Sequence, residues 1–129
     1  MFLQYPCKNF KRFAKFIKTF PSRPYIGNIN IDPILIEKSI TNKTKAIIIV
    51  HMYGKSCDMD SILDICNRHN LILIEDCAQA HGAKYKSKNI GTFGAFSFYL
   101  IKNLGALGDG VAILCDYSFY SDKLRKLRN

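Results

Sequence analysis

The fold is decided by the run Ala46-Ile47-Ile48-Ile49-Val50, an uninterrupted apolar stretch near the middle of the chain. Its β-branched residues do not alternate with polar ones, which predicts a strand buried on both faces, as in a parallel sheet. A second such run, Leu71-Ile72-Leu73-Ile74, follows a segment with apolar residues at helical spacing, namely Met59, Ile62, Leu63 and Cys66. The sequence therefore predicts a β–α–β unit from Ala46 to Asp76.

Elements on both sides extend this alternating pattern. Residues 33–40 are typical of a helix, because Asp32 can cap it and Pro33 suits its first position. Beyond the second strand, residues 95–99 and 111–114 indicate two short strands, and residues 121–127 indicate the start of a helix. We therefore expect an α/β fold with a mostly parallel sheet flanked by helices.

Composition excludes several classes of protein. The chain has 129 residues, the size of one domain or part of one, and its 48% hydrophobic content rules out a wholly disordered chain. Five cysteines without a CxxC pair argue against a disulfide framework and a zinc site, so we expect no metal. No apolar run approaches the ~18 residues that span a bilayer, and without a signal peptide the expected location is the cytoplasm.

The net charge of +9 is concentrated at the N-terminus. No acidic residue precedes Ile31, whereas six of the 19 basic residues do, interleaved with phenylalanines at roughly helical spacing. Residues 1–20 are thus a basic amphipathic segment that we leave unassigned. It could lie on a membrane or RNA, target an organelle, or pack on the body with solvated lysines. For the main body, whose charges are balanced, we expect neither a nucleic-acid nor a membrane partner.

Polar side chains gather where the predicted strands end. Asp76 comes directly after the second strand, Ser97 lies in the third, and Lys102 follows shortly after it. Ligands of open α/β sheets bind beyond the carboxyl ends of the strands, so we expect the Asp76 carboxylate to point into that crevice. Lys102 lies between an apolar strand and a glycine-rich turn, where partial desolvation favours a neutral amine.

These residue types fit one kind of site. A neutral amine can form a Schiff base with an aldehyde cofactor, and a carboxylate can keep a pyridine nitrogen protonated. The hydroxyl of Ser97 could donate a hydrogen bond to a phosphate. A pyridoxal phosphate site requires these parts. Spacing alone leaves plainer interpretations open, with Lys102 as an ordinary surface lysine and Asp76 as a helix cap or turn residue.

Two longer stretches carry a resemblance to a known family. They are Ile74-Glu75-Asp76-Cys77-Ala78-Gln79-Ala80-His81-Gly82-Ala83 and Phe96-Ser97-Phe98-Tyr99-Leu100-Ile101-Lys102-Asn103-Leu104-Gly105-Ala106-Leu107-Gly108-Asp109-Gly110. They resemble the aspartate and lysine motifs of the DegT/DnrJ/EryC1/StrS family of sugar aminotransferases, and residues 44–54 resemble the strand and turn before them. The resemblance covers residues 21–129. It implies part of the pyridoxal-phosphate-binding large domain of the fold-type I, aspartate-aminotransferase-like architecture.

The resemblance also implies roles for four residues. Lys102 would bind the cofactor covalently and move protons, and Asp76 would pair with the pyridinium nitrogen. Gln79 would lie near the cofactor ring, and Ser97 would contact the phosphate. The implied reaction moves an amino group from glutamate to a nucleotide-linked keto-deoxysugar. The form of the lysine motif is most similar to members that aminate carbon 3 of dTDP-keto sugars.

The chain departs from the family in length and at a few positions. Family members are much longer and act as homodimers with shared active sites, so we expect residues 21–129 to hold only part of the cofactor's surroundings. Val111 stands where a glycine is usual, and a turn that needs glycine would be strained there. Two other functions stay open: an inactive remnant of such an aminotransferase, and a basic module that binds membrane or nucleic acid.

Overall fold

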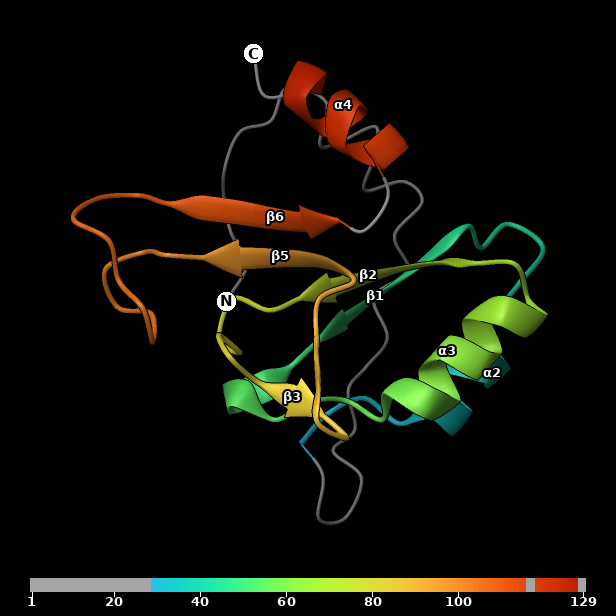
Figure 1. Cartoon of the computed structure of the whole chain (residues 1–129). Helices are drawn as coiled ribbons and strands as arrows, with labels where there is room; N and C mark the ends of the chain where they lie inside the picture. The colour runs from blue at the N-terminus through green and yellow to red at the C-terminus, as the bar shows by residue number, and fades with distance from the viewer. Residues whose placement is uncertain (1–28, 116–117, 128–129) are drawn as a thin grey trace.

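The computed structural model describes residues 29–115 and 118–127, and the basic segment 1–20 lies outside these ranges. A four-stranded sheet forms the centre of the molecule (Figure 1). Its strands are β1 (Ala46–Val50), β2 (Ile72–Asp76), β5 (Phe93–Ser97) and β6 (Val111–Cys115), adjacent in that order. β1, β2 and β5 are parallel and β6 is antiparallel to β5, which confirms the predicted mostly parallel sheet.

The other elements lie around this sheet. They are the helices α2 (Pro33–Ser39), α3 (Met59–Arg68) and α4 (Ser118–Leu127), the 3₁₀ turn η1 (Met52–Gly54), and the short hairpin of β3 (Lys84–Tyr85) and β4 (Lys88–Asn89). Asp32 caps α2 as predicted, because its Oδ1 accepts a hydrogen bond of 2.9 Å from the amide of Ile34. None of the helices in the described ranges is long and apolar enough to cross a membrane.

The β–α–β unit is confirmed, with β1 and β2 paired from Ala46–Ile72 to Val50–Asp76. One face of the sheet packs on α2 and α3, which lie side by side in Figure 1. This core includes Ile36 of α2, Ile47 and Ile49 of β1, and Ile62 and Ile65 of α3. Burial of these branched side chains removes their apolar surface from water and holds the helices to the sheet.

The opposite face of the sheet is more open. Val50 is 40% exposed and Ile72 is 50% exposed, although both belong to the central apolar runs. The prediction that these strands are buried on both faces is therefore wrong for the part of the chain that the structure describes. The reason is that the core of α2 and α3 covers only the face that carries Ile47 and Ile49.

Two strands differ from their predicted limits. β2 continues through Glu75 and Asp76, and β5 covers residues 93–97 instead of 95–99. Gly94 lies within β5, and a Cβ there would come within 2.7 Å of the Cα of Gly91, so close packing explains the glycine. Val111 begins β6 and is not among the positive-φ residues, so the strain expected there does not arise.

Candidate functional site

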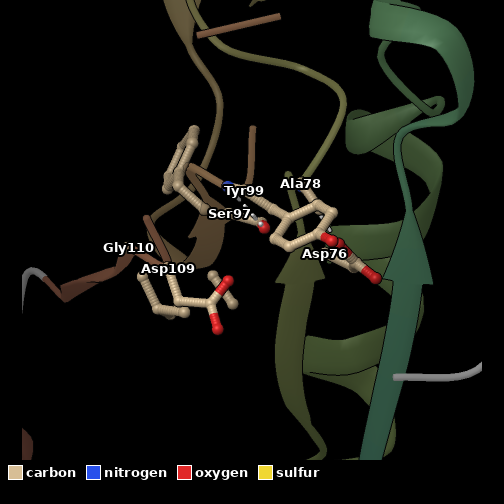
Figure 2. A pocket seen from close by; sticks show the side chains of 9 residues that line it. Asp76, Ala78, Ser97, Tyr99, Asp109 and Gly110 are labelled. Atoms are coloured by element: carbon tan, nitrogen blue, oxygen red, sulfur yellow. Dashed lines mark hydrogen bonds between the residues drawn. The ribbon is translucent and has the colours of Figure 1, made fainter. Parts of the chain in front are cut away.

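The C-terminal ends of β2 and β5 place Asp76 and Ser97 at one edge of the sheet. Asp76 is in register with Ala95, two residues before Ser97, so the three side chains share a face. A pocket of about 130 Å³ opens there (Figure 2). It is lined by Asp76, Ala78, Ala95, Phe96, Ser97, Tyr99, Asp109, Gly110 and Val111. The predicted crevice beyond the strand ends therefore exists and contains two of the four predicted site residues.

Asp76 is partly buried and is held by its own turn. Its Oδ1 accepts a hydrogen bond of 3.0 Å from the amide of Ala78, so the interpretation of Asp76 as a turn residue is correct for this oxygen. Within the described ranges no hydrogen-bond donor is assigned to Oδ2. One carboxylate oxygen thus fixes the side chain, and the other is available to a ligand in the pocket.

Ser97 is the last residue of β5 and is only 8% exposed. Its Oγ accepts a hydrogen bond of 3.4 Å from the amide of Tyr99, which leaves the hydroxyl proton for another acceptor. Figure 2 shows the ring of Tyr99 extending across the pocket toward Asp76. The serine hydroxyl and the aspartate carboxylate therefore lie on two sides of one small space.

Lys102 and Gln79 lie on the two turns that follow these strands, and neither lines the pocket. The Lys102 amide donates to the carbonyl of Tyr99 at 2.8 Å, which forms a tight turn, and its side chain is partly buried. Asn103 joins the two turns, because its Nδ2 donates to the carbonyl of Gln79 at 3.1 Å. The structure thus brings the lysine turn against the turn that follows Asp76.

Three residues near the site have no role that the sequence predicts: Tyr99, Asn103 and Asp109. All three lie in the stretch that resembles the lysine motif. Asp109 reaches the pocket because β6 runs antiparallel to β5 and returns the chain to the end of that strand. That return could have been inferred from the three glycines in the connection of residues 98–110, because they disfavour the helix that a parallel crossover usually contains.

A buried polar pair lies on the opposite face of β2. Glu75 is 1% exposed, His51 is fully buried, and the His51 Nε2 lies 3.1 Å from the Glu75 Oε2. Burial favours the neutral carboxyl, but hydrogen bonds from His51, Gly91 and Thr92 outweigh it and lower the pKa of Glu75 below its usual range. Glu75 is therefore an ionised carboxylate that is enclosed in protein, and both of its oxygens accept hydrogen bonds.

The same pair belongs to the one group of possible metal ligands in the described ranges, His51, Glu75 and Cys77, whose ligand atoms lie within 4.8 Å of one another. Both ring nitrogens of His51 have partners, since Nδ1 accepts from the Cys57 amide at 3.1 Å and Nε2 faces Glu75. Burial and the nearby carboxylates raise the pKa of Cys77 to about 12, which opposes the thiolate that a metal would need. Within this group, His51 and Glu75 thus form a hydrogen-bonded pair.

Known proteins are similar to this chain along most of its length. One relative is the dTDP-3-amino-3,6-dideoxy-alpha-D-galactopyranose transaminase of Aneurinibacillus thermoaerophilus, 55% identical over 82% of this chain and 30% of that protein. The crystal structure of Streptomyces venezuelae DesV, in complex with a ketimine intermediate, matches with a TM-score of 0.85 and 40% identity. It covers 98% of this chain and 35% of that chain.

A second solved structure, Bacillus subtilis NtdA with bound cofactor PMP, matches with a TM-score of 0.63 and 42% identity over 69% of this chain and 20% of that chain. The present chain therefore spans about a third or less of the proteins that it resembles. The fold agrees with that of sugar aminotransferases that depend on pyridoxal phosphate. The family model matches residues 25–129, and the chain belongs to the DegT/DnrJ/EryC1/StrS aminotransferase family.

Proposed function

We propose that this protein takes part in pyridoxal-phosphate-dependent transamination of a nucleotide-linked keto-deoxysugar. The observation that carries the proposal is the pocket at the ends of β2 and β5, where the Asp76 carboxylate and the Ser97 hydroxyl line one space. The turn that holds Lys102 begins directly beyond β5 and is bonded to the turn that holds Gln79. Carboxylate, hydroxyl and lysine are the groups that this cofactor needs around it.

The residues present fit the cofactor. Asp76 has an oxygen available to hold a proton on the pyridine nitrogen, and Ser97 has a hydroxyl proton that can be donated to the phosphate. Lys102 would bind the cofactor and afterwards carry protons, while Gln79 would contact the ring from the neighbouring turn. Bound pyridoxal 5'-phosphate supplies an aldehyde and an electron sink. The protein's own part is to orient the ring, keep its nitrogen charged and move protons.

The relatives support the proposed substrate class. The Aneurinibacillus protein is named as a transaminase of a dTDP-linked 3-amino sugar, so we favour a dTDP-3-keto-6-deoxyhexose as the acceptor. Glutamate as the amino donor is proposed from the family resemblance of the two motifs. A homodimer, with active sites completed across it, is part of the same proposal. The open sheet face that carries Val50 and Ile72 supports further protein packing on the described part of the chain.

Cofactor titration followed by covalent trapping tests the proposal. Adding pyridoxal 5'-phosphate to the purified chain should give the visible absorbance band of a lysine-bound cofactor, and borohydride reduction should place the adduct on Lys102 by peptide mass spectrometry. Lys102→Ala should abolish the band. Lys88→Ala, which removes an exposed lysine of the β3–β4 hairpin, is the matched control and should leave the band unchanged.

The results that would contradict the proposal are equally specific. A folded chain that shows no band, or adducts spread over surface lysines without preference for Lys102, would favour the inactive remnant. If the band forms, adding glutamate should convert it to the spectrum of the amino form of the cofactor. If the band forms but glutamate does not convert it, the proposed cofactor site stands and the proposed transamination is wrong.

A further inference from the structure

We propose that Glu75 is a positioning residue that holds the neighbouring Asp76 carboxylate in the direction that the pocket requires. The inference rests on the proposed function only for its cofactor readout, since the hydrogen bonds that carry it belong to the chain itself. Adjacent residues of a strand point to opposite faces. Fixing the side chain of Glu75 on the core face therefore also fixes the backbone from which Asp76 reaches the pocket.

Glu75 connects three segments of the chain that meet at the edge of the site. Its Oε2 accepts from the Gly91 amide at 2.8 Å and lies 3.1 Å from the His51 Nε2, and its Oε1 accepts from the Thr92 amide at 2.9 Å. His51 follows β1, and Gly91 and Thr92 lead into β5. One carboxylate thus links the segment after β1 and the segment before β5 to the C-terminal end of β2.

His51 is fixed in turn by its other ring nitrogen. Because Nδ1 accepts the hydrogen bond of the Cys57 amide, the proton of the neutral ring is assigned to Nε2, which then donates to Glu75. The buried side chain of Asn30 secures the same loop, donating to the carbonyls of Lys55 and Ser56 at 2.9 Å and accepting from the amide of Met52 at 3.0 Å. Glu75 is therefore held by groups that cannot shift easily.

The backbone at Asp76 connects this network to the pocket. The His51 amide donates to the carbonyl of Asp76 at 3.1 Å, and the Cys77 amide donates to the carbonyl of Ala95 at 2.8 Å. These bonds link the backbone at Asp76 to the chain on both sides of β2, toward β1 and toward β5. A rotation of β2 at this point would therefore change the position of Asp76 relative to Ser97, and the bonds of Glu75 resist that rotation.

Glu75→Gln tests the proposal with little change in shape. The amide keeps one acceptor but presents an NH₂ group where the carboxylate accepted a hydrogen bond, so at least one donor loses its partner. Glu37→Gln is the matched control, because Glu37 is also an ion-paired carboxylate, bonded to Arg68 and His69, but lies on α2 away from the pocket. Both variants are compared with the unmodified chain.

Amide hydrogen exchange gives a readout that needs no cofactor. The Ala78 amide is bonded to the Asp76 Oδ1 and so reports the position of that carboxylate. In Glu75→Gln we expect exchange at Gly91, Thr92 and also Ala78 to accelerate at least about tenfold. Acceleration at Gly91 and Thr92 without any change at Ala78 would overturn the proposal, because Glu75 would then only fasten the loop before β5.

Cofactor affinity gives the second readout and separates positioning from general stability. Glu75→Gln should weaken pyridoxal phosphate binding about tenfold, and this loss should disappear when the substitution is made in Asp76→Asn. If Glu75→Gln weakens cofactor binding equally in the unmodified chain and in Asp76→Asn, Glu75 does not act through Asp76, and the proposal is wrong. If the unmodified chain binds no cofactor, the proposed function fails while the exchange experiment still decides the positioning role.

A further pair of variants protects the test against misfolding. His51→Gln can place a donor near the position of Nε2 and keep the bond to Glu75, whereas His51→Leu leaves the carboxylate without that partner. We expect His51→Gln to retain most of the protection at Ala78 and His51→Leu to lose it. Equal protection at Ala78 in the two variants would contradict the proposed chain of contacts.

Discussion

Glu75 and Asp76 are neighbours with the same functional group, and the structure treats them in opposite ways. Glu75 is almost fully buried and accepts hydrogen bonds from three donors in two other segments of the chain. The Asp76 side chain is partly buried, and among the described residues its carboxylate accepts one hydrogen bond, from the Ala78 amide in its own turn. The difference shows that the two faces of β2 have different roles at the end of the strand. The face toward the helices holds the architecture together, and the opposite face keeps an oxygen free for a ligand.

The first prediction sharpens this contrast and has the largest expected effect. Glu75→Ala should lower the free energy of unfolding by about 3 kcal/mol or more, because it leaves His51 and two backbone amides without their buried acceptor. Asp76→Ala should cost less than about 1 kcal/mol, since it removes one local hydrogen bond. Urea denaturation of the two variants, followed by circular dichroism, measures both changes.

Cofactor titration should rank the same two variants differently. Asp76→Ala should bind pyridoxal phosphate poorly although it is nearly as stable as the unmodified chain. Equal destabilisation by the two substitutions would break the comparison, because it would give the two carboxylates the same structural role. A stable Glu75→Ala would contradict the claim that this carboxylate joins three segments.

Much of the fold could be predicted because local patterns of apolar residues determine it. The apolar run from Ala46 to Val50 and the helical spacing from Met59 to Cys66 produce β1 and α3 close to the expected positions. The reason for Gly94 is not a local pattern, because it is a contact with Gly91 that only the folded chain makes. Exposure of Val50 likewise depends on which elements cover each face, and periodicity cannot show this.

The site divides in the same way. Asp76 and Ser97 could be placed at one sheet edge because parallel strands bring their carboxyl ends together. His51 and Glu75 are 24 residues apart, and no spacing rule links a residue after β1 to one near the end of β2. Nothing in the sequence alone shows that the first of two adjacent acids turns to the core. Register decides it, since a shift by one residue would exchange their faces.

The second prediction concerns the stability that Glu75, on the core face of β2, contributes at different pH values. Because the pKa of Glu75 is lowered in the folded chain, its ionised form contributes stability above the usual carboxyl pKa, and that contribution is lost as the pH falls through the lower folded value. The stability difference between the unmodified chain and Glu75→Gln should therefore shrink between about pH 6 and about pH 3. Urea midpoints at several pH values measure it.

The stability of Glu75→Gln has to be compared with that of the unmodified chain at each pH, because other carboxylates titrate in the same pH range. Hydrogen bonds from Arg68 and His69 lower the pKa of Glu37, and a hydrogen bond from Ser61 lowers that of Asp58. These groups are present in both proteins and cancel in the difference. A difference that stays constant down to about pH 3 would show that Glu75 contributes by shape and not by charge.

The smallest predicted effect concerns the contact between the two turns on the pocket side. Asn103→Ala removes the exposed hydrogen bond to the carbonyl of Gln79, so it should cost about 0.5–1 kcal/mol of stability or less. Cofactor binding should weaken by a factor of about 2–5, because the Lys102 turn is then less fixed against the turn after Asp76. Asn89→Ala, in the β3–β4 hairpin, is the control and should leave cofactor binding unchanged.

A loss in affinity as large as that of Asp76→Ala would mean that Asn103 itself contacts the cofactor. No loss at all would mean that the lysine turn is positioned by its own bond between Lys102 and Tyr99, independently of the neighbouring turn.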